Sequence, residues 1–202
     1  MLNLNEFARQ VHENAKKHGF WESKITGGEL VAWLHSELSE SYEEHRLNHP
    51  MVWYSCTDAN GAKQEYCGKN GICTTKFSCA YRNPKPEGIA VELIDVCLLI
   101  LDYVGAVGIH LENCCSIRSM IDLLSDECRR SIQSMHFPDF IAQMHMEVSA
   151  AYQMNSPEGF VHALLPTQGM IFYWIEAEEL DPEAILLEKF HYNENRPYKH
   201  GR

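Results

Sequence analysis

The chain has 202 residues, which is enough for one globular domain or two small ones. Its 17 basic and 28 acidic residues give a formal charge of −11, which argues against a nucleic-acid polymer as partner because such binding depends on basic patches. A hydrophobic content of 45% is sufficient for a packed core, and no apolar run approaches the roughly 20 residues that span a bilayer. Eight cysteines and an N-terminus without an export signal favour reduced thiols. We therefore expect a soluble, cytoplasmic protein that binds neither nucleic-acid polymers nor membranes, although a single nucleotide with a charge-masking metal remains compatible.

Helical periodicity dominates the chain and predicts an all-α fold. Apolar residues recur at spacings of three and four in the first segment, and Gly19 ends it. Pro86 is suited to the start of a later helix whose apolar residues continue to Val107. The expected helices are residues 3–18, 29–46, 86–107, 110–124, 138–154, 158–179 and 182–194.

Residues 47–85 depart from this pattern. They hold two Asn-Gly pairs and a short alternating apolar run, which is typical of a β-hairpin, and a segment of this size rarely has a core of its own. We therefore interpret the segment as an inserted hairpin and loop. Its cysteines lack the close pairs of a structural zinc site, so free thiols on a flap that could cover a substrate are the simpler expectation. The cysteines are Cys56, Cys67, Cys73 and Cys79.

Two constant offsets indicate an internal duplication. Residues 86–88, Pro-Glu-Gly, recur as residues 157–159, 71 positions later, and apolar positions downstream keep this offset. Residues 32–42 match residues 142–152 at an offset of 110. The offsets differ by 39, the length of the insertion, so one duplicated helical unit with an insertion in its first copy explains both. Chance similarity between helical segments is the alternative.

The repeats would span residues 1–117 and 118–202, and only the first would carry the insertion. His35 and His145 occupy equivalent positions in the two copies. A histidine kept in both copies is more easily explained by packing than by a site that one copy has lost, so we expect a packing role for both.

Four carboxylates in two helical pairs carry the expected chemistry. Glu37 with Glu40, and Glu92 with Asp95, are spaced so that each pair shares one helix face. The second pair interrupts the most apolar predicted helix, where an uncompensated charge is costly. Carboxylates that face one another repel unless a cation joins them, and oxygen ligands suit Mg²⁺ or Mn²⁺. The alternatives are a solvated helix face for the first pair and a salt bridge to a buried base for the second.

Several short motifs support a more specific interpretation. ELSE is followed by KPEGIAVELID and by a tail EKFHYNENRPYKHGR, and HENAKKHGFW lies near the N-terminus. Together they resemble the MazG-like, all-α nucleotide pyrophosphohydrolases over about residues 10–46, 85–112 and 183–202. In that family ExxE on one helix and ExxD on the next hold Mg²⁺, and the last helix carries Lys-x-x-Tyr-Asn. The resemblance implies a MazG-like helical bundle whose metal ligands are Glu37, Glu40, Glu92 and Asp95.

The resemblance also implies a reaction, the hydrolysis of a nucleoside triphosphate to a monophosphate and pyrophosphate by attack of water on the α-phosphorus. Bound Mg²⁺ would lower the pKa of that water, and Glu40, with Glu37 beside it, is the expected catalytic carboxylate. The expected substrate-binding residues are Lys189, Tyr192, Asn193 and Arg196 for phosphate and sugar, and Trp21 and His12 for the base. Packing of the first loop is the alternative role for Trp21.

The chain departs from the family pattern in complementary ways. The insertion lengthens the spacing between the acidic motifs, and residues 114–122 take the place of the last helix without its Lys-Tyr-Asn motif. The second repeat keeps Glu147 but has Ala150, Ala163 and Pro166 at the other ligand positions. We therefore expect an intrachain pseudo-dimer with one active site, which could pair further as a homodimer. In the rival account the second repeat has simply decayed and the tail serves its own half or another chain.

Two other functions stay open on the sequence alone. The same fold could act on deoxypyrimidine nucleotides in the manner of a dUTPase or dCTPase, or it could bind nucleotides as a sensor without turnover. Retention of all four carboxylates in the first repeat favours an enzyme, whereas their loss from the second repeat shows that decay has been tolerated.

Overall fold

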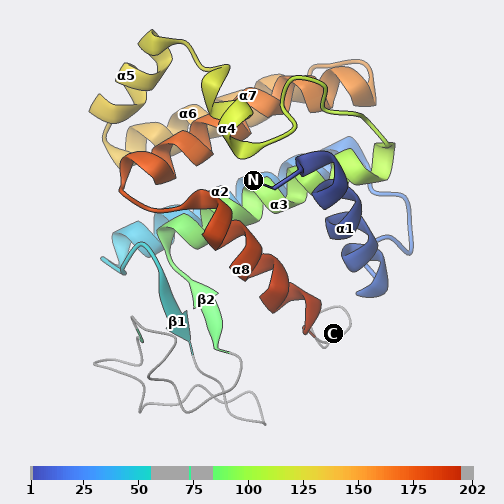
Figure 1. The fold of residues 1–202 in the computed structure, drawn as a ribbon, viewed down its shortest axis with the longest axis horizontal. Helices are drawn as coiled ribbons and strands as arrows, with labels where there is room; N and C mark the ends of the chain where they lie inside the picture. Colours follow the sequence, from blue (N-terminus) through green and yellow to red (C-terminus); the bar gives the residue numbers. More distant parts are fainter. Residues whose placement is uncertain (1, 56–72, 74–83, 197–202) are drawn as a thin grey trace.

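The computed structural model describes residues 2–55, 73 and 84–196. This part of the chain contains eight α-helices and one pair of short strands (Figure 1). The all-α class expected from the periodicity is confirmed. The helices are α1 (Leu4–Lys17), α2 (Gly27–Arg46), α3 (Ile89–Val107), α4 (Ile117–Asp122), α5 (Asp126–Ser134), α6 (Phe137–Ala151), α7 (Pro157–Ala177) and α8 (Pro182–Glu194). The strands are β1 (Trp53–Ser55) and β2 (Lys85–Glu87). None of the helices in the described ranges is long and apolar enough to cross a membrane.

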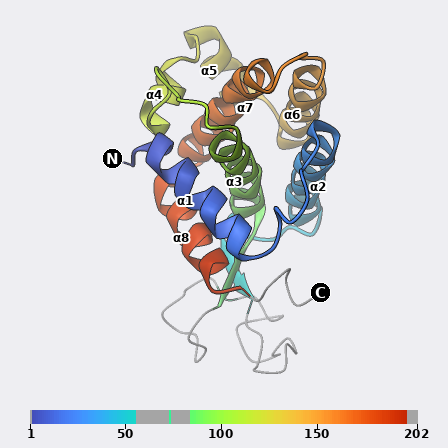
Figure 2. The same cartoon turned by 90° about the vertical axis from the view of Figure 1, so that its right-hand side faces the viewer.

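The central element is α3, which is buried on nearly all sides (Figure 2). It contacts α1, α2, α7 and α8, while α6 packs against both α2 and α7. The four helices α2, α3, α6 and α7 therefore form a bundle, with α1 and α8 added on α3 and with α4 and α5 added on α7. This position explains why the sequence of α3 is almost continuously apolar instead of amphipathic.

Two contacts inside the bundle join residues that the sequence offsets pair. The rings of His35 and His145 are stacked with their centroids 4.9 Å apart, and the two Nδ1 atoms lie 2.7 Å from each other. Gln168 Nε2 donates a hydrogen bond of 3.0 Å to the carbonyl oxygen of Cys97, 71 positions away. Burial lowers the pKa of both histidines, so one neutral ring donates to the other.

The antiparallel strands lie at the two ends of the insertion. Trp53 pairs with Glu87 and Ser55 with Lys85, while Cys73 forms an isolated bridge with Tyr54. Cys73 is buried. The Asn-Gly pairs and the other three cysteines of the insertion lie outside the described residues. The expectation about zinc concerns these cysteines, so it also falls outside the described residues.

Two helix predictions were wrong in detail. Residue 86 pairs in β2, and α3 begins only at Ile89, because Gly88 with a φ of 114° breaks the helical path. The segment predicted as one helix over 110–124 is helical only in α4. The side chain of Asn5 bonds both the N–H and the carbonyl of Leu111, at 2.7 and 3.2 Å, which diverts the backbone from helical pairing.

Helix α5 was not anticipated, although its start carries a recognisable signal. Ser125 caps the helix by accepting a hydrogen bond from the N–H of Cys128, and two acidic residues follow in the first turn. Only Ile132 of this helix is buried, so the apolar periodicity on which the other predictions relied is nearly absent.

Candidate metal centre and adjoining cavity

Three of the four expected ligands meet between α2 and α3. One carboxylate oxygen from each of Glu37, Glu40 and Glu92 lies within 4.8 Å of the other two. The register of the two helices is fixed nearby, where the buried Ser41 hydroxyl donates to the carbonyl of Ile89 at 3.0 Å. Glu92 is 5% exposed, Glu37 is half-buried and Glu40 faces solvent. The cluster, defined by these three glutamates, is therefore open on its Glu40 side.

The electrostatics of the cluster favour a cation. Burial, with repulsion from Asp95 and Glu40, raises the pKa of Glu37 to about 8. Burial also raises the pKa of Glu92 to about 9, although the ammonium of Lys189 acts in the opposite direction. A divalent cation can replace the protons that these side chains otherwise retain at neutral pH. Because all the donors are oxygens, the residues fit Mg²⁺ or Mn²⁺.

Asp95, the fourth expected ligand, is held by an ion pair from the far end of the chain. Lys189 Nζ of α8 lies 2.7 Å from Asp95 Oδ2, and the Lys189 side chain is only 1% exposed. Burial alone would lower the pKa of Lys189, but the carboxylates of Asp95 and Glu92 outweigh it and raise the pKa. The alternative considered for the second acidic pair, a salt bridge to a buried base, thus describes Asp95 but not Glu92. The Lys189–Asp95 ion pair also brings α8 beside the glutamate cluster.

A cavity of about 730 Å³ adjoins the cluster, with Glu37 and Asp95 in its wall. Its other lining residues are both apolar and polar, and the polar ones from α1 and the loop after it are Asn14, His18, Glu22 and Ser23. The apolar and aromatic lining residues are Val11, Ala15, Phe20, Trp33, Leu98, Leu99 and Phe190. Asn193 of α8 and Arg196, which lies just after that helix, add polar groups. A wall that combines apolar and aromatic side chains with polar groups is typical of a small-molecule site.

The C-terminal residues expected to bind substrate are close together. Asn193 Oδ1 accepts a hydrogen bond of 3.1 Å from Arg196 Nη1. The Arg196 guanidinium also lies 5.7 Å from the centroid of the Tyr192 ring, a cation–π contact. Asn193 and Arg196 line the cavity, whereas Tyr192 is not among its lining residues.

The residues expected to bind the base, Trp21 and His12, are instead bonded to an aspartate. Trp21 Nε1 is 3.0 Å from both carboxylate oxygens of Asp102, and His12 Nδ1 is 2.8 Å from Oδ1. Of these three residues, only Asp102 lines the cavity. Burial raises the pKa of Asp102, while the bonds from His12 and Trp21 oppose that rise. The arrangement agrees with the packing role considered for Trp21.

Close packing of α1 on α3 makes this arrangement possible. A Cβ atom at Gly105 would lie 2.7 Å from the Cβ of His12 and would also collide with the backbone of Ala8. Asp102 was not identified from the sequence as a candidate site residue. The signal was present, because Asp102, like Glu92, is a carboxylate in the most apolar predicted helix.

The second half of the bundle has no comparable centre in the residues that are described. Glu147, the counterpart of Glu37, accepts a hydrogen bond from Gln143, and no second group of three potential metal ligands was found in those ranges. A smaller cavity of about 480 Å³ lies where residues 110–114 meet α4 and α7. Pro166, the counterpart of Asp95, is part of its wall.

Comparison of the chain with protein-family models, with curated proteins and with solved structures found no match in any of the three. The features of the molecule that bear on its function are therefore the glutamate cluster, the Lys189–Asp95 pair and the cavity beside them.

Proposed function

We propose that this protein is a Mg²⁺-dependent nucleoside triphosphate pyrophosphohydrolase, which releases pyrophosphate and a nucleoside monophosphate. The observation that carries the proposal is the convergence of Glu37, Glu40 and Glu92 at the edge of a cavity large enough for a nucleoside. Three of the four carboxylates to which the motif resemblance points, Glu37, Glu40 and Glu92, are the ones that converge, while Asp95 pairs with Lys189 beside them.

The carboxylates have distinct roles in the proposed reaction. Glu37, Glu40 and Glu92 would hold Mg²⁺, with Mn²⁺ as a substitute, and the cation supplies charge neutralisation for the phosphates and acidifies the attacking water. Glu40 is the only exposed member of the cluster, so its carboxylate accepts the proton of a water that arrives from solvent. Glu37 supports it from the same helix face.

The cavity and α8 position the nucleotide. The base and sugar lie against the apolar wall, where Trp33 and Phe20 offer aromatic surfaces. Arg196 and Asn193 donate to phosphate or sugar oxygens, and arginine suits phosphate because its planar fork can bind two oxygens. Lys189 keeps a positive charge beside the reacting phosphate while it orients Asp95.

We further propose that the bundle is an internal pseudo-dimer of two MazG-like repeats with a single site. The contacts between equivalent residues, His35 with His145 and Cys97 with Gln168, support an internal two-fold axis. Helices α2 and α6 also begin 110 residues apart. The pairing of Lys189 with Asp95 supports the contribution of the second repeat to the site of the first.

A nucleotide panel tests the proposal. The purified protein with Mg²⁺ is incubated with each common ribonucleoside and deoxynucleoside triphosphate, including dUTP, and pyrophosphate and monophosphate are quantified. We expect equal amounts of both products from at least one nucleotide and none in EDTA. Turnover confined to dUTP or dCTP would favour the deoxypyrimidine enzyme, and binding without any product would favour the sensor. Release of orthophosphate alone would contradict attack at the α-phosphorus.

A further inference from the structure

Lys85 is a second lysine near the N-terminal end of α3, the end that carries Glu92, and it lies on the strand that precedes this helix. It lies on β2, which contacts both α3 and α8 (Figure 1). Its Nζ atom is 2.6 Å from Glu87 Oε2, and its side chain is 33% exposed. Glu87 is held in turn by the Ser55 hydroxyl of the neighbouring strand at 2.9 Å.

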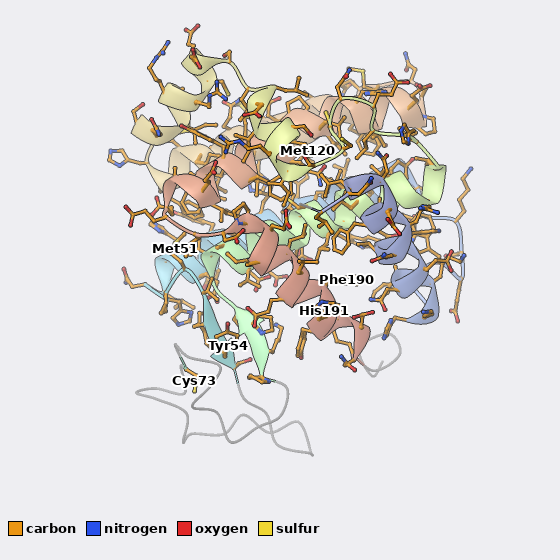
Figure 3. The ribbon with its side chains drawn as sticks, viewed as in Figure 1. Met51, Tyr54, Cys73, Met120, Phe190 and His191 are labelled. Carbon is orange, nitrogen blue, oxygen red and sulfur yellow. The ribbon has the colours of Figure 1, made fainter. Side chains whose placement is uncertain are left out.

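The backbone around Lys85 is fixed relative to the cluster. At the junction of β2 and α3, a Cβ atom on Gly88 would lie 2.7 Å from the carbonyl oxygens of Pro50 and Met51, so only glycine allows this approach. The N–H of Ala90 donates to the same Met51 carbonyl at 3.0 Å. Tyr54 lies on β1 (Figure 3), and its hydroxyl donates to Glu188 Oε2 of α8 at 3.0 Å. This bond ties the strands to the helix that carries Lys189.

Lys85 and Lys189 have different freedom to meet a ligand. The positive charges of both lower the pKa of Glu37 and Glu92, which places both ammonium groups within electrostatic reach of the cluster. Lys189 is buried and committed to Asp95. Lys85 is partly exposed, and Glu87 keeps its bond from Ser55 when the lysine turns away. Lys85 can therefore transfer to an anionic ligand without leaving the half-buried Glu87 carboxylate unbonded.

The order of groups along α3 suggests which part of a ligand Lys85 meets. Asp102 and Leu98 line the cavity, Asp95 and Glu92 follow toward the helix N-terminus, and β2 precedes that end. Asp102 and Glu92 are separated by roughly 15 Å along the axis, at about 1.5 Å per residue, which is comparable to a nucleoside with its first phosphate. Lys85 is not part of the cavity wall, and its strand joins α3 at the end farther from Asp102, toward which the rest of a polyphosphate would extend.

We propose that Lys85 binds the β- and γ-phosphates of the substrate and accompanies the leaving pyrophosphate, an inference that rests on the proposed function. The oxygen of the attacking water forms a bond to the α-phosphorus. The bond from that phosphorus to the α–β bridging oxygen breaks, and its electron pair leaves with the pyrophosphate. One proton of the water passes to the Glu40 carboxylate. Lys85 stays protonated and pairs with the negative charge that develops on the leaving group.

Binding of Mg²⁺–pyrophosphate, measured by calorimetry, tests this role without turnover. We expect Lys85→Met to weaken that binding by about tenfold or more, and Lys85→Arg to restore it to within about threefold. Binding of the nucleoside monophosphate, which lacks the outer phosphates, is expected to be unchanged. Lys16→Met is the matched control, because it also removes a lysine from an ion pair, with Glu13, but on α1 away from the cluster.

The outcomes separate this inference from the proposed function. If the nucleotide panel releases pyrophosphate but Lys85→Met binds Mg²⁺–pyrophosphate like the wild type, the role of Lys85 is wrong and the reaction stands. Equal weakening toward the monophosphate would also overturn the role, because it would indicate a general structural effect. If the panel yields no product while pyrophosphate binding depends on Lys85, the polyphosphate site stands and the proposed reaction fails.

Discussion

Replacing Glu92 by glutamine is expected to abolish pyrophosphate release. The amide has nearly the shape of the carboxyl group but cannot supply an anionic oxygen to a cation, and losing about 4 kcal/mol of transition-state stabilisation lowers kcat roughly a thousandfold. The fold should persist, because the raised pKa of about 9 means that the metal-free protein already holds a neutral side chain at this position at neutral pH. Pyrophosphate release and far-ultraviolet circular dichroism, measured on the same preparation, test both statements.

Glu147→Gln is the matched control for this variant. Glu147 lies 110 positions after Glu37 in the sequence, and its carboxylate accepts a hydrogen bond from Gln143 on the same helix. The same chemical change should therefore leave kcat within about twofold of the wild type. Glu92→Gln with more than about a tenth of wild-type activity, or with lost helicity, would contradict the assignment.

Replacing Lys189 by methionine is expected to lower kcat/KM by about a hundredfold or more and to destabilise the protein. The variant keeps the aliphatic stem but removes the charge that holds Asp95 in place. Loss of one partner from a buried ion pair typically costs about 3–5 kcal/mol, and we expect about 2–3 kcal/mol here. The smaller value follows because the Asp95 side chain is 17% exposed and can be partly solvated. Urea unfolding in EDTA and the kinetics of pyrophosphate release measure the two effects.

The double variant Asp95→Asn with Lys189→Met separates stability from catalysis. With neither charge left in the pair, much of the lost stability should return, while turnover should stay low. Unchanged turnover in Lys189→Met would mean that α8 does not contribute to the site, and it would favour the account in which the second repeat has merely decayed.

The sequence identified the acidic cluster because a charged residue in an apolar helix is a local signal. Glu92 is a charged residue among apolar neighbours, and Asp95 follows it three positions later in the sequence. The sequence did not indicate which basic residue pairs with Asp95, because Lys189 lies on a helix near the other end of the chain. Only the packing of α8 on α3 brings the two together.

The wall of the cavity shows the same limit. Sequence reasoning placed Trp21 and His12 in a nucleotide site because of the residue types, but it could not say which face of the first loop meets α3. The close approach allowed by Gly105 brings both side chains onto Asp102. Long-range contacts of this kind leave no periodic pattern, whereas helix formation and burial do.

The central claim, that the glutamate cluster holds a divalent cation, has a consequence for pH. Because the pKa values of Glu37 and Glu92 are raised to about 8 and about 9, the folded metal-free protein retains protons that the unfolded chain loses near pH 4.5. These two groups therefore stabilise the fold fully at low pH, and their contribution is lost as the pH rises toward 8–9. A bound cation replaces the protons, so the affinity for the cation should increase over the same range.

Calorimetric titration of the metal-free protein with Mn²⁺, in two buffers of different ionisation enthalpy, tests that claim most directly. At pH 7 we predict binding coupled to the release of between one and two protons, tighter binding at pH 8.5, and affinity reduced by about a hundredfold in Glu92→Gln. Absence of binding, or binding that releases no protons and is undiminished in Glu92→Gln, would contradict the account.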